Sequence, residues 1–102
     1  PDIEIVFVID TGFEGALALP TAAVEALDLP FRTNLTANLA DDSNVQTKVH
    51  RADIVWHGVE MQVAVLSMGR RPLLGTALLF YKHLGIDFKE NGTVTIGDIP
   101  EE

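Results

Sequence analysis

The chain lacks cysteine altogether and is poor in basic residues, and each absence excludes a class of site. Without Cys there are no disulfides, no thiolate metal sites and no Cys nucleophile. Seven Lys and Arg stand against fifteen Asp and Glu, which gives a net charge of −8. Nucleic acids and anionic membrane surfaces both attract basic patches. We therefore expect no nucleic acid as a partner and no membrane contact in this segment.

Long apolar runs are missing as well. No stretch approaches the roughly 18 residues of a membrane helix, and no signal-peptide pattern is present. A cytoplasmic location is therefore favoured. The chain opens at Pro1 rather than Met, which leaves room for a flanking or anchoring segment outside these residues.

Two common catalytic and binding motifs are absent. Ser43 and Ser67 lack a nucleophile-elbow context such as G-x-S-x-G, which argues against a Ser-His-Asp hydrolase. Gly58, Gly69 and Gly75 are isolated, and no G-K-[ST] follows any of them. The chain therefore has no phosphate-binding loop.

The spacing of His50, Asp53 and His57 could suggest a metal site, but strand geometry argues against it. On a strand, alternate side chains point to opposite faces, so His50 points away from the other two. Asp53 and His57 would lie roughly 13 Å apart along the strand, too far to share one zinc ion. Asp41 and Asp42 could bind a cation, although two carboxylates at a turn are more often simply solvated. We expect no metal and no cofactor.

A hydrophobic content of 47% fits one folded domain over residues 1–102. Strands are expected at 3–9, 16–19, 33–39, 45–56, 61–66, 86–89 and 93–96, with a hairpin turn at Asn91-Gly92. Short helices are expected at 20–27, with Thr21 as N-cap, and at 77–84, with Thr76 as N-cap and Gly85 after its end. This mostly-β pattern, without βαβ alternation, predicts a small closed or partly open β-barrel.

The polar cluster Ala40-Asp41-Asp42-Ser43-Asn44 lies between two of these strands. Clusters of Asp, Ser and Asn between apolar segments are typical of turns. The segment 39–45 is therefore expected to be the tip of a hairpin, acidic and mobile.

The stretch Ile5-Val6-Phe7-Val8-Ile9 runs straight into Asp10-Thr11-Gly12. Because the apolar run is continuous, it predicts a strand buried on both faces. An unpaired charge is very costly in such a place, so Asp10 needs hydrogen-bond partners or a chemical task. The ordinary interpretation is a strand that ends in a turn, since Asp, Thr and Gly are all common turn residues.

The same Asp-Thr-Gly is followed some 60 residues later by Leu73-Leu74-Gly75, just before a short predicted helix. With a hairpin between them, these two segments resemble the retropepsin-like (clan AA) aspartic proteases along nearly the whole chain. Phe13-Glu14-Gly15 looks more like the bacterial single-domain members than the viral ones. The resemblance implies a small closed β-barrel of the acid-protease type, with the hairpin as a flap over the site.

The resemblance also implies roles for individual residues. Asp10 would be the catalytic carboxylate of an aspartic endopeptidase. Support of the active site is expected from Thr11, Gly12, Leu73, Leu74 and Gly75. Substrate binding is expected from Gly12, Phe13, Glu14, Asp41, Asp42, Ser43 and Asn44.

One such carboxylate cannot perform this reaction, because the family uses two Asp side chains that share a proton. None of the other seven Asp residues is followed by Thr-Gly or Ser-Gly. The second carboxylate must therefore come from another copy, and a two-fold homodimer supplies it. The substrate would be an extended peptide or protein segment, bound as an added strand under two flaps.

Three departures from the family pattern leave an alternative. Phe13 stands where Ala or Ser is usual, Glu14 where retroviral members have Asp, and Thr76 where they have Arg. The Asp–Arg pair that braces the retroviral dimer is thus missing, and a weak dimer is expected. The alternative is a catalytically silent retropepsin-like dimerisation or peptide-binding module. A third reading is a plain β-barrel in which Asp10 caps a turn.

Overall fold

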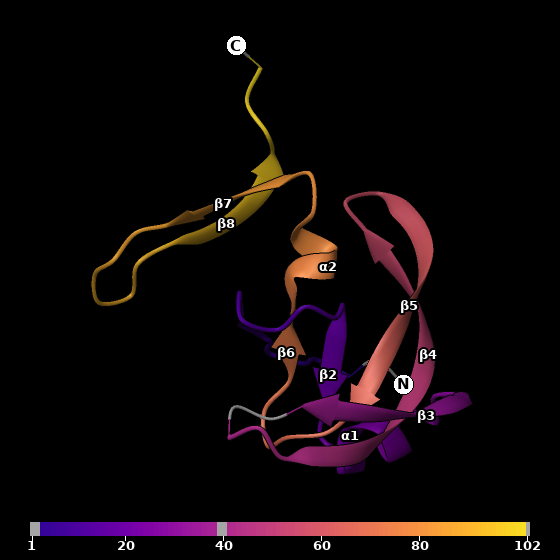
Figure 1. Cartoon of the computed structure of the whole chain (residues 1–102). Helices are drawn as coiled ribbons and strands as arrows, with labels where there is room; N and C mark the ends of the chain where they lie inside the picture. Colours follow the sequence, from indigo (N-terminus) through magenta and orange to yellow (C-terminus); the bar gives the residue numbers. More distant parts are fainter. Residues whose placement is uncertain (1–2, 39–40, 102) are drawn as a thin grey trace.

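The computed structural model describes residues 3–38 and 41–101 (Figure 1). The structure is mostly β, with 48% of residues in strands and 10% in two short helices. In chain order the elements are β1 (Val8–Ile9), β2 (Leu17–Leu19), α1 (Thr21–Ala26), β3 (Phe31–Asn38), β4 (Asn44–Trp56), β5 (Val59–Ser67), β6 (Leu73–Leu74), α2 (Thr76–Leu79), β7 (Lys82–Ile86) and β8 (Val94–Asp98). Neither helix is long and apolar enough to cross a membrane, and the described residues contain no other helix.

Six of the strands form one sheet, in the order β1-β6-β2-β5-β4-β3. The pairs β1–β6 and β2–β5 are parallel, and the other neighbours are antiparallel. In the described residues β1 and β3 are the two edges and do not pair with each other. The expected mostly-β class is therefore confirmed, whereas closure into a barrel is not, because the sheet is open.

The core lies where β2 and β5 meet α1 and α2. Burial is strongest in the middle of the sheet, and the cluster comprises Leu17, Leu19, Val24, Val63, Val65, Leu74 and Leu78. Helix α1 contributes Val24, and its remaining residues stay half-buried or exposed. Val65 is fully enclosed, since β5 has a neighbour on both sides and helices over its inner face. The core therefore fixes β2 and β6, which flank the loop after β1.

The first strand differs from its prediction. Strand β1 covers Val8–Ile9 rather than residues 3–9. It is not buried on both faces: Ile5 and Phe7 pack against the core, while Val6 is 80% exposed. Its side chains alternate between two faces: those of Ile5 and Phe7 face the core, and those of Val6 and Val8 lie on the opposite, exposed face.

The second helix is also shorter than predicted. It ends at Leu79 rather than Leu84, because Phe80 is extended and Tyr81 has a φ of 62° in the left-handed region. Residues 82–86 then form β7, so Gly85 lies inside a strand and does not follow a helix. Neither predicted N-cap is confirmed: Thr21 and Thr76 are first helical residues, and no side chain caps α1 or α2.

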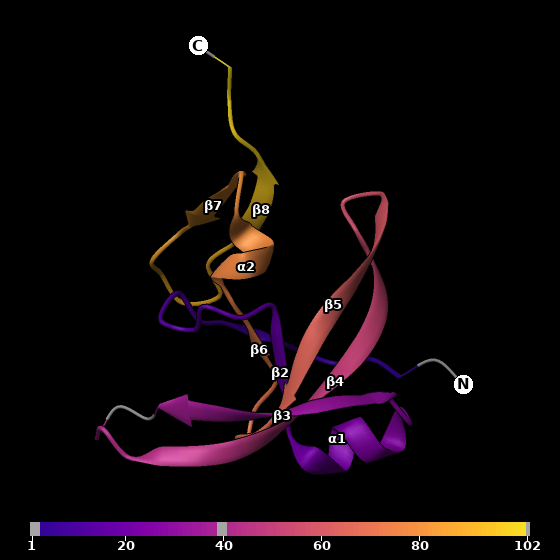
Figure 2. The same cartoon turned by 45° about the vertical axis from the view of Figure 1, so that its right-hand side comes forward.

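Strands β7 and β8 form a separate two-stranded sheet. This hairpin projects from the end of α2, away from the six-stranded sheet, in both views (Figures 1 and 2). The predicted turn at Asn91-Gly92 is present, with Asn91 at φ 58° and the Gly92 amide donating to the Lys89 carbonyl over 2.9 Å. The strands on either side differ from those expected, at 82–86 and 94–98 rather than 86–89 and 93–96.

The long hairpin of β3 and β4 is present, and its register runs from Phe31↔His50 to Asn38↔Asn44. Asp41, Asp42 and Ser43 lie in the turn between its strands. Residues 39 and 40, which were predicted as the end of a strand and the start of the turn, lie outside the described residues. The turn at His57-Gly58 between β4 and β5 is as predicted, with both residues at positive φ.

Candidate active site

Asp10 directly follows β1, beside the Leu73-Leu74 strand β6. The Val8 amide donates to the Pro72 carbonyl and the Asp10 amide to the Leu74 carbonyl, both over 2.9 Å. Parallel pairing places Ile9 opposite Leu74. The structure thus brings together the two segments that the sequence resemblance rests on.

A tight turn holds the Asp10 carboxylate in place. Its Oδ1 accepts the Gly12 amide over 2.9 Å, and the Asp10 carbonyl accepts the Phe13 amide over 3.1 Å. A Cβ on Gly12 would lie 3.2 Å from the same Oδ1, which is tight enough to disturb it. Asp10 is half-buried, and within residues 3–38 and 41–101 its Oδ2 has no hydrogen bond. One carboxylate oxygen is therefore fixed and the other is open to a ligand or to water.

The loop that carries Asp10 is tied to the start of α2. Both the amide and the hydroxyl of Thr76 donate to the Phe13 carbonyl, over 2.8 Å and 3.3 Å. The Gly75 amide donates to the Ala16 carbonyl over 2.9 Å. A Cβ on Gly75 would collide with the Gly15 carbonyl and with Phe13, so glycine is required for this close approach. The loop after β1 and the segment that leads into α2 are in this way locked together.

Thr76 therefore has a role that sequence reasoning missed. Thr76 stands where retroviral members have Arg. The sequence therefore predicts that the Asp–Arg pair, which braces the retroviral dimer, is lost. In the structure Thr76 braces the loop inside one chain, through the carbonyl of a residue 63 positions away. The only hint of this role in the sequence is that a residue with a hydroxyl group directly follows Leu-Leu-Gly.

Two predicted residues of the loop make no hydrogen bond through their side chains in the described part of the chain. Thr11 and Glu14 are both exposed. The resemblance implies that Thr11 makes hydrogen bonds across the two-fold axis of the homodimer, and these bonds need a second copy of the chain. Phe13 is half-buried, and its ring lies 2.6 Å from the position that a Cβ on Gly15 would occupy. Phe13 thus packs inside the loop and offers its carbonyl, rather than its ring, to α2.

The flap residues lie apart from Asp10 in a single chain. Asp41, Asp42, Ser43 and Asn44 are exposed, and no hydrogen bond joins the described ones to the loop at 10–15. Both views nevertheless place the tip of the β3–β4 hairpin on the same side of the molecule as that loop (Figures 1 and 2).

The flap tip has internal order of its own. The Ser43 hydroxyl and amide both donate to Asp41 Oδ1, over 2.5 Å and 3.0 Å. These two bonds, the hydroxyl bond first, lower the pKa of Asp41 below its ordinary value. Asp42 takes the left-handed conformation at φ 65°, which Asp tolerates better than most residues. Asp41 therefore stays ionised further into the acid range than a free carboxyl would.

The histidines considered as metal ligands have other neighbours. His50 Nδ1 lies 3.0 Å from the Leu29 carbonyl, and the ring packs edge-on against Phe31. His57 packs edge-on against Trp56 with ring centroids 4.7 Å apart. In the described residues no group of three or more His, Asp or Glu is placed to hold a metal ion.

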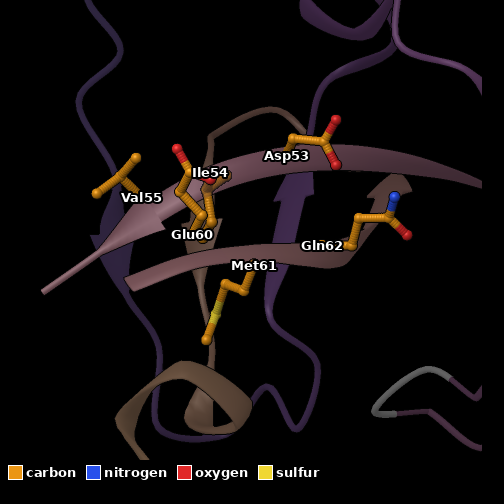
Figure 3. Close-up of a pocket in the computed structure, with 6 residues that line it drawn as sticks. All are labelled: Asp53, Ile54, Val55, Glu60, Met61 and Gln62. Atoms are coloured by element: carbon orange, nitrogen blue, oxygen red, sulfur yellow. The ribbon is translucent and has the colours of Figure 1, made fainter. Parts of the chain in front are cut away.

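Three surface hollows are lined by residues away from Asp10. One, of about 440 Å³, lies on the outer face of β4 and β5, where Asp53 pairs with Gln62 and Val55 with Glu60 (Figure 3). A second, of about 230 Å³, lies beside α1 and includes Lys48 and His50. The third, of about 240 Å³, lies between the β4–β5 turn and α2, and we call it the α2 hollow. Its lining is Trp56, His57, Val59, Met61, Ala77, Leu78, Phe80 and Lys82.

Comparisons with protein-family models, with curated proteins and with solved structures gave no match. The functional argument therefore depends on the residues and geometry of this chain.

Proposed function

We propose that this chain is one half of a homodimeric aspartic endopeptidase of the retropepsin-like kind. The observation that carries the proposal is the state of Asp10. Its carboxylate follows a strand, is held by the Gly12 amide through one oxygen, and leaves the other oxygen without a partner in the described part of the chain. A merely capped turn would also show the bond to Gly12, but it would not require the Leu73-Leu74 strand to pair beside Asp10.

The chemistry requires a second carboxylate, which we assign to Asp10 of another copy. Two carboxylates about 3 Å apart cannot both ionise, so the pair shares one proton. The ionised member removes a proton from a water that attacks the scissile carbonyl carbon, and the protonated member donates to the carbonyl oxygen. As the C–N bond then breaks, one carboxyl donates its proton to the leaving amine, and a hydroxyl of the tetrahedral intermediate returns its proton to the other carboxylate as the new carbonyl group forms. The net reaction consumes one water and leaves the two carboxylates with one shared proton again.

Substrate would approach where backbone groups are accessible. Gly12 is exposed, so a peptide backbone can come close to Asp10. Strand β3 is a sheet edge with β4 as its neighbour, so its outer backbone groups are free to pair with an extended peptide. The proposed ligand is thus an unfolded protein segment, bound partly through its main chain.

The retropepsin-like β-barrel is part of the same proposal. In a retropepsin-like barrel the six-stranded sheet would form the body, and closure would depend on where the β7–β8 hairpin comes to rest. The exposed apolar side chains of the β1 segment, Val6 at 80% and Val8 at 43%, are consistent with a face that a second copy covers.

One observation favours the silent module as a second candidate. Thr76 satisfies its hydroxyl within the chain, and no ion pair in the described residues braces the loop. A dimer without such a brace could bind peptides and fail to align two carboxylates for cleavage.

Replacement of Asp10 by Asn tests the proposal. Asn keeps the shape and the contact with Gly12 but cannot exchange protons, so peptide hydrolysis should fall by about 100-fold or more. The assay is mass-spectrometric detection of new peptide ends in an unfolded protein substrate, between pH 4 and 7. Asp53→Asn, an exposed carboxylate on the outer face of β4, is the matched control and should keep full activity. Equal cleavage by wild type and Asp10→Asn would refute the role of Asp10, and binding without any cleavage by wild type would favour the silent module.

A further inference from the structure

The β7–β8 hairpin has one apolar face and one polar face. The register pairs Leu84 with Ile96 and Ile86 with Val94, which puts these four apolar side chains on one face, with the Lys82–Asp98 pair at its root. The opposite face carries His83 and Gly85, paired with Gly97 and Thr95. Beyond the root, this alternation is typical of a sheet that is covered on one side.

In the single chain this apolar face is covered only in part, because Leu84 and Ile96 are half-buried and the residues nearer the turn are exposed. Ile86 is 43% exposed and Val94 is 52% exposed, and Phe88 just beyond β7 is 94% exposed. One ion pair, from Lys82 Nζ to Asp98 Oδ1 over 3.1 Å, joins the two strands near their root. A two-stranded hairpin alone is marginally stable at best in water. The hairpin therefore needs a surface to pack against.

The α2 hollow offers such a surface. Six of its eight lining residues are apolar, and Trp56 fixes its shape by donating from Nε1 to the Leu78 carbonyl over 2.9 Å. Met61 extends from β5 toward α2, on the inner face of the β4–β5 hairpin (Figure 3). Phe80 at the rim is 70% exposed. The hollow is thus an open apolar site built on fixed walls.

The hairpin of the same chain is badly placed to fill this hollow. Phe80 and Lys82, at the root of the hairpin, line the hollow themselves. Ile86 lies four residues further along a strand, roughly 13 Å away at the usual rise. Figure 1 shows the hairpin leading away from α2. The occupant therefore has to come from outside the chain.

We propose that the β7–β8 hairpin of one protomer packs its apolar face and Phe88 into the α2 hollow of a second copy, and that the second copy returns the same contact. A two-fold dimer permits this exchange, because surface and hairpin are present on each chain. The charges are compatible with this contact: the hairpin turn carries Asp87 and Glu90, and the polar rim of the hollow carries no acidic residue but His57 and Lys82, whose Nζ also pairs with Asp98 of its own hairpin.

The available area is large enough for a dimer. Phe80 at the rim of the hollow is 70% exposed, and Phe88 of the hairpin is 94% exposed. Aromatic side chains bury roughly 150–250 Å² each, so two of them on each of two protomers supply on the order of 600–1,000 Å². That is near the lower limit for a specific protein–protein interface. The aliphatic residues of the hairpin add to this area.

This inference deepens the proposed function, because it rests on the homodimer and names what holds it together. It also places the exchange next to the active site. The hollow and the Asp10 loop share α2, whose first residue, Thr76, binds the Phe13 carbonyl. A partner hairpin seated against α2 would therefore lie close to the loop that carries Asp10.

Matched substitutions on the two faces of the hairpin test the exchange. Val94→Lys puts a charge on the apolar face, and Thr95→Lys puts the same charge on the polar face one residue later. By sedimentation equilibrium, Val94→Lys should raise the dimer dissociation constant by at least about 10-fold, and Thr95→Lys should leave it near the wild-type value. Met61→Lys and Gln62→Lys form the corresponding pair for the hollow. Equal effects within either pair would overturn the proposal.

Cross-linking decides which chain fills the hollow and does not depend on stability. The chain has no Cys, so Phe88→Cys and Val59→Cys each introduce a single thiol. After the two variants are mixed with a short dithiol-reactive cross-linker, a mixed adduct between two chains is expected. The double variant at dilution would give a cross-link within one chain if the hairpin folded back, and that result would refute the exchange. Adducts of Phe88→Cys with itself alone would refute it too.

The failure of this inference can be told apart from the failure of the proposed function. If Val94→Lys stays dimeric and active while Asp10→Asn is inactive, the hairpin is not the dimer contact and the catalytic proposal stands. If wild type dimerises through the hairpin but cleaves nothing, the exchange stands and the catalytic proposal falls.

Discussion

The Asp10 loop packs against the start of α2, the β7–β8 hairpin follows its end, and the two are held in different ways. The loop is tied to α2 and β6 by backbone hydrogen bonds from Asp10, Gly75 and Thr76, and it tolerates no side chain at Gly75. The hairpin is held mainly by its own ladder, and its apolar face is exposed. A loop that positions a reacting group gains from rigidity within the chain. An exposed apolar hairpin gains its stability from a partner.

Glycine substitutions should separate the two regions most strongly. Gly75→Ala places a Cβ against the Gly15 carbonyl and Phe13, and the backbone cannot yield cheaply there. We expect a loss of about 2–4 kcal/mol in the free energy of unfolding, measured by urea denaturation, together with loss of activity. Gly97→Ala in the hairpin is the matched control, because a Cβ there meets no atom within 4 Å. It should change stability by less than about 0.5 kcal/mol. Similar losses for both variants would contradict the assigned rigidity of the loop.

A smaller effect is expected from Thr76→Val. The change removes the hydroxyl bond to the Phe13 carbonyl at 3.3 Å and leaves the shorter amide bond in place. Stability should fall by about 0.5–1.5 kcal/mol, and kcat should fall more than KM rises if the loop positions Asp10. Thr95→Val on the polar face of the hairpin should change neither value. An unaltered kcat in Thr76→Val would show that this brace does not serve the active site.

The smallest effect concerns the flap charges and pH. Four acidic side chains, Asp41 and Asp42 from each of two copies, would repel one another near the proposed entrance at neutral pH. Because the bonds from Ser43 lower the pKa of Asp41, this repulsion should persist in mild acid, and activity should improve only as the pH falls into the range where carboxylates take up protons. The double change of Asp41 and Asp42 to Asn should lower KM at neutral pH and flatten this pH dependence. An unchanged KM at neutral pH would exclude a gating role for these charges.

Ser43→Ala sharpens the same point. Hydrogen bonds from Ser43 lower the pKa of Asp41. The ionised Asp41 therefore stabilises the folded flap tip at pH values above its unfolded pKa. This stabilisation is lost as the pH falls through the lowered pKa of the folded state. Without the hydroxyl its pKa should rise toward the ordinary value, measured by NMR titration of the carboxyl carbon. The acid-side gain in activity should then begin at a higher pH. If the Asp41 pKa stays where it is, the bond in solution differs from that in the structure.

The sequence correctly predicted the elements that have strong short-range signals. The β3–β4 hairpin, the turn at His57-Gly58 and the first helix follow from alternation, turn residues and Pro20. The pairing of Asp-Thr-Gly with Leu-Leu-Gly was predicted from resemblance, and the β1–β6 register brings the two segments together as expected.

Predictions failed where distant residues decide the structure. Thr76 as N-cap and Gly85 as a stop predicted a helix over 77–84, yet Lys82–Ile86 pairs with Val94–Asp98 instead. The long-range ladder outweighs a weak helix propensity. The apolar run before Asp10 predicted burial on both faces, but sequence does not show that Val6 and Val8 lie on an exposed face. The bond from Thr76 to a backbone carbonyl likewise has no local signature.

The most direct test of the central claim asks whether one active site needs Asp10 from two chains. Wild type is mixed with about a tenfold excess of Asp10→Asn, allowed to exchange subunits, and assayed for peptide cleavage at constant wild-type concentration. If both carboxylates are required, nearly every wild-type chain pairs with an inactive partner, and activity should fall roughly tenfold. An unrelated inert protein in the same excess should have no effect. Undiminished activity in the mixture, with subunit exchange verified, would show that a single chain carries the whole site and would contradict this account.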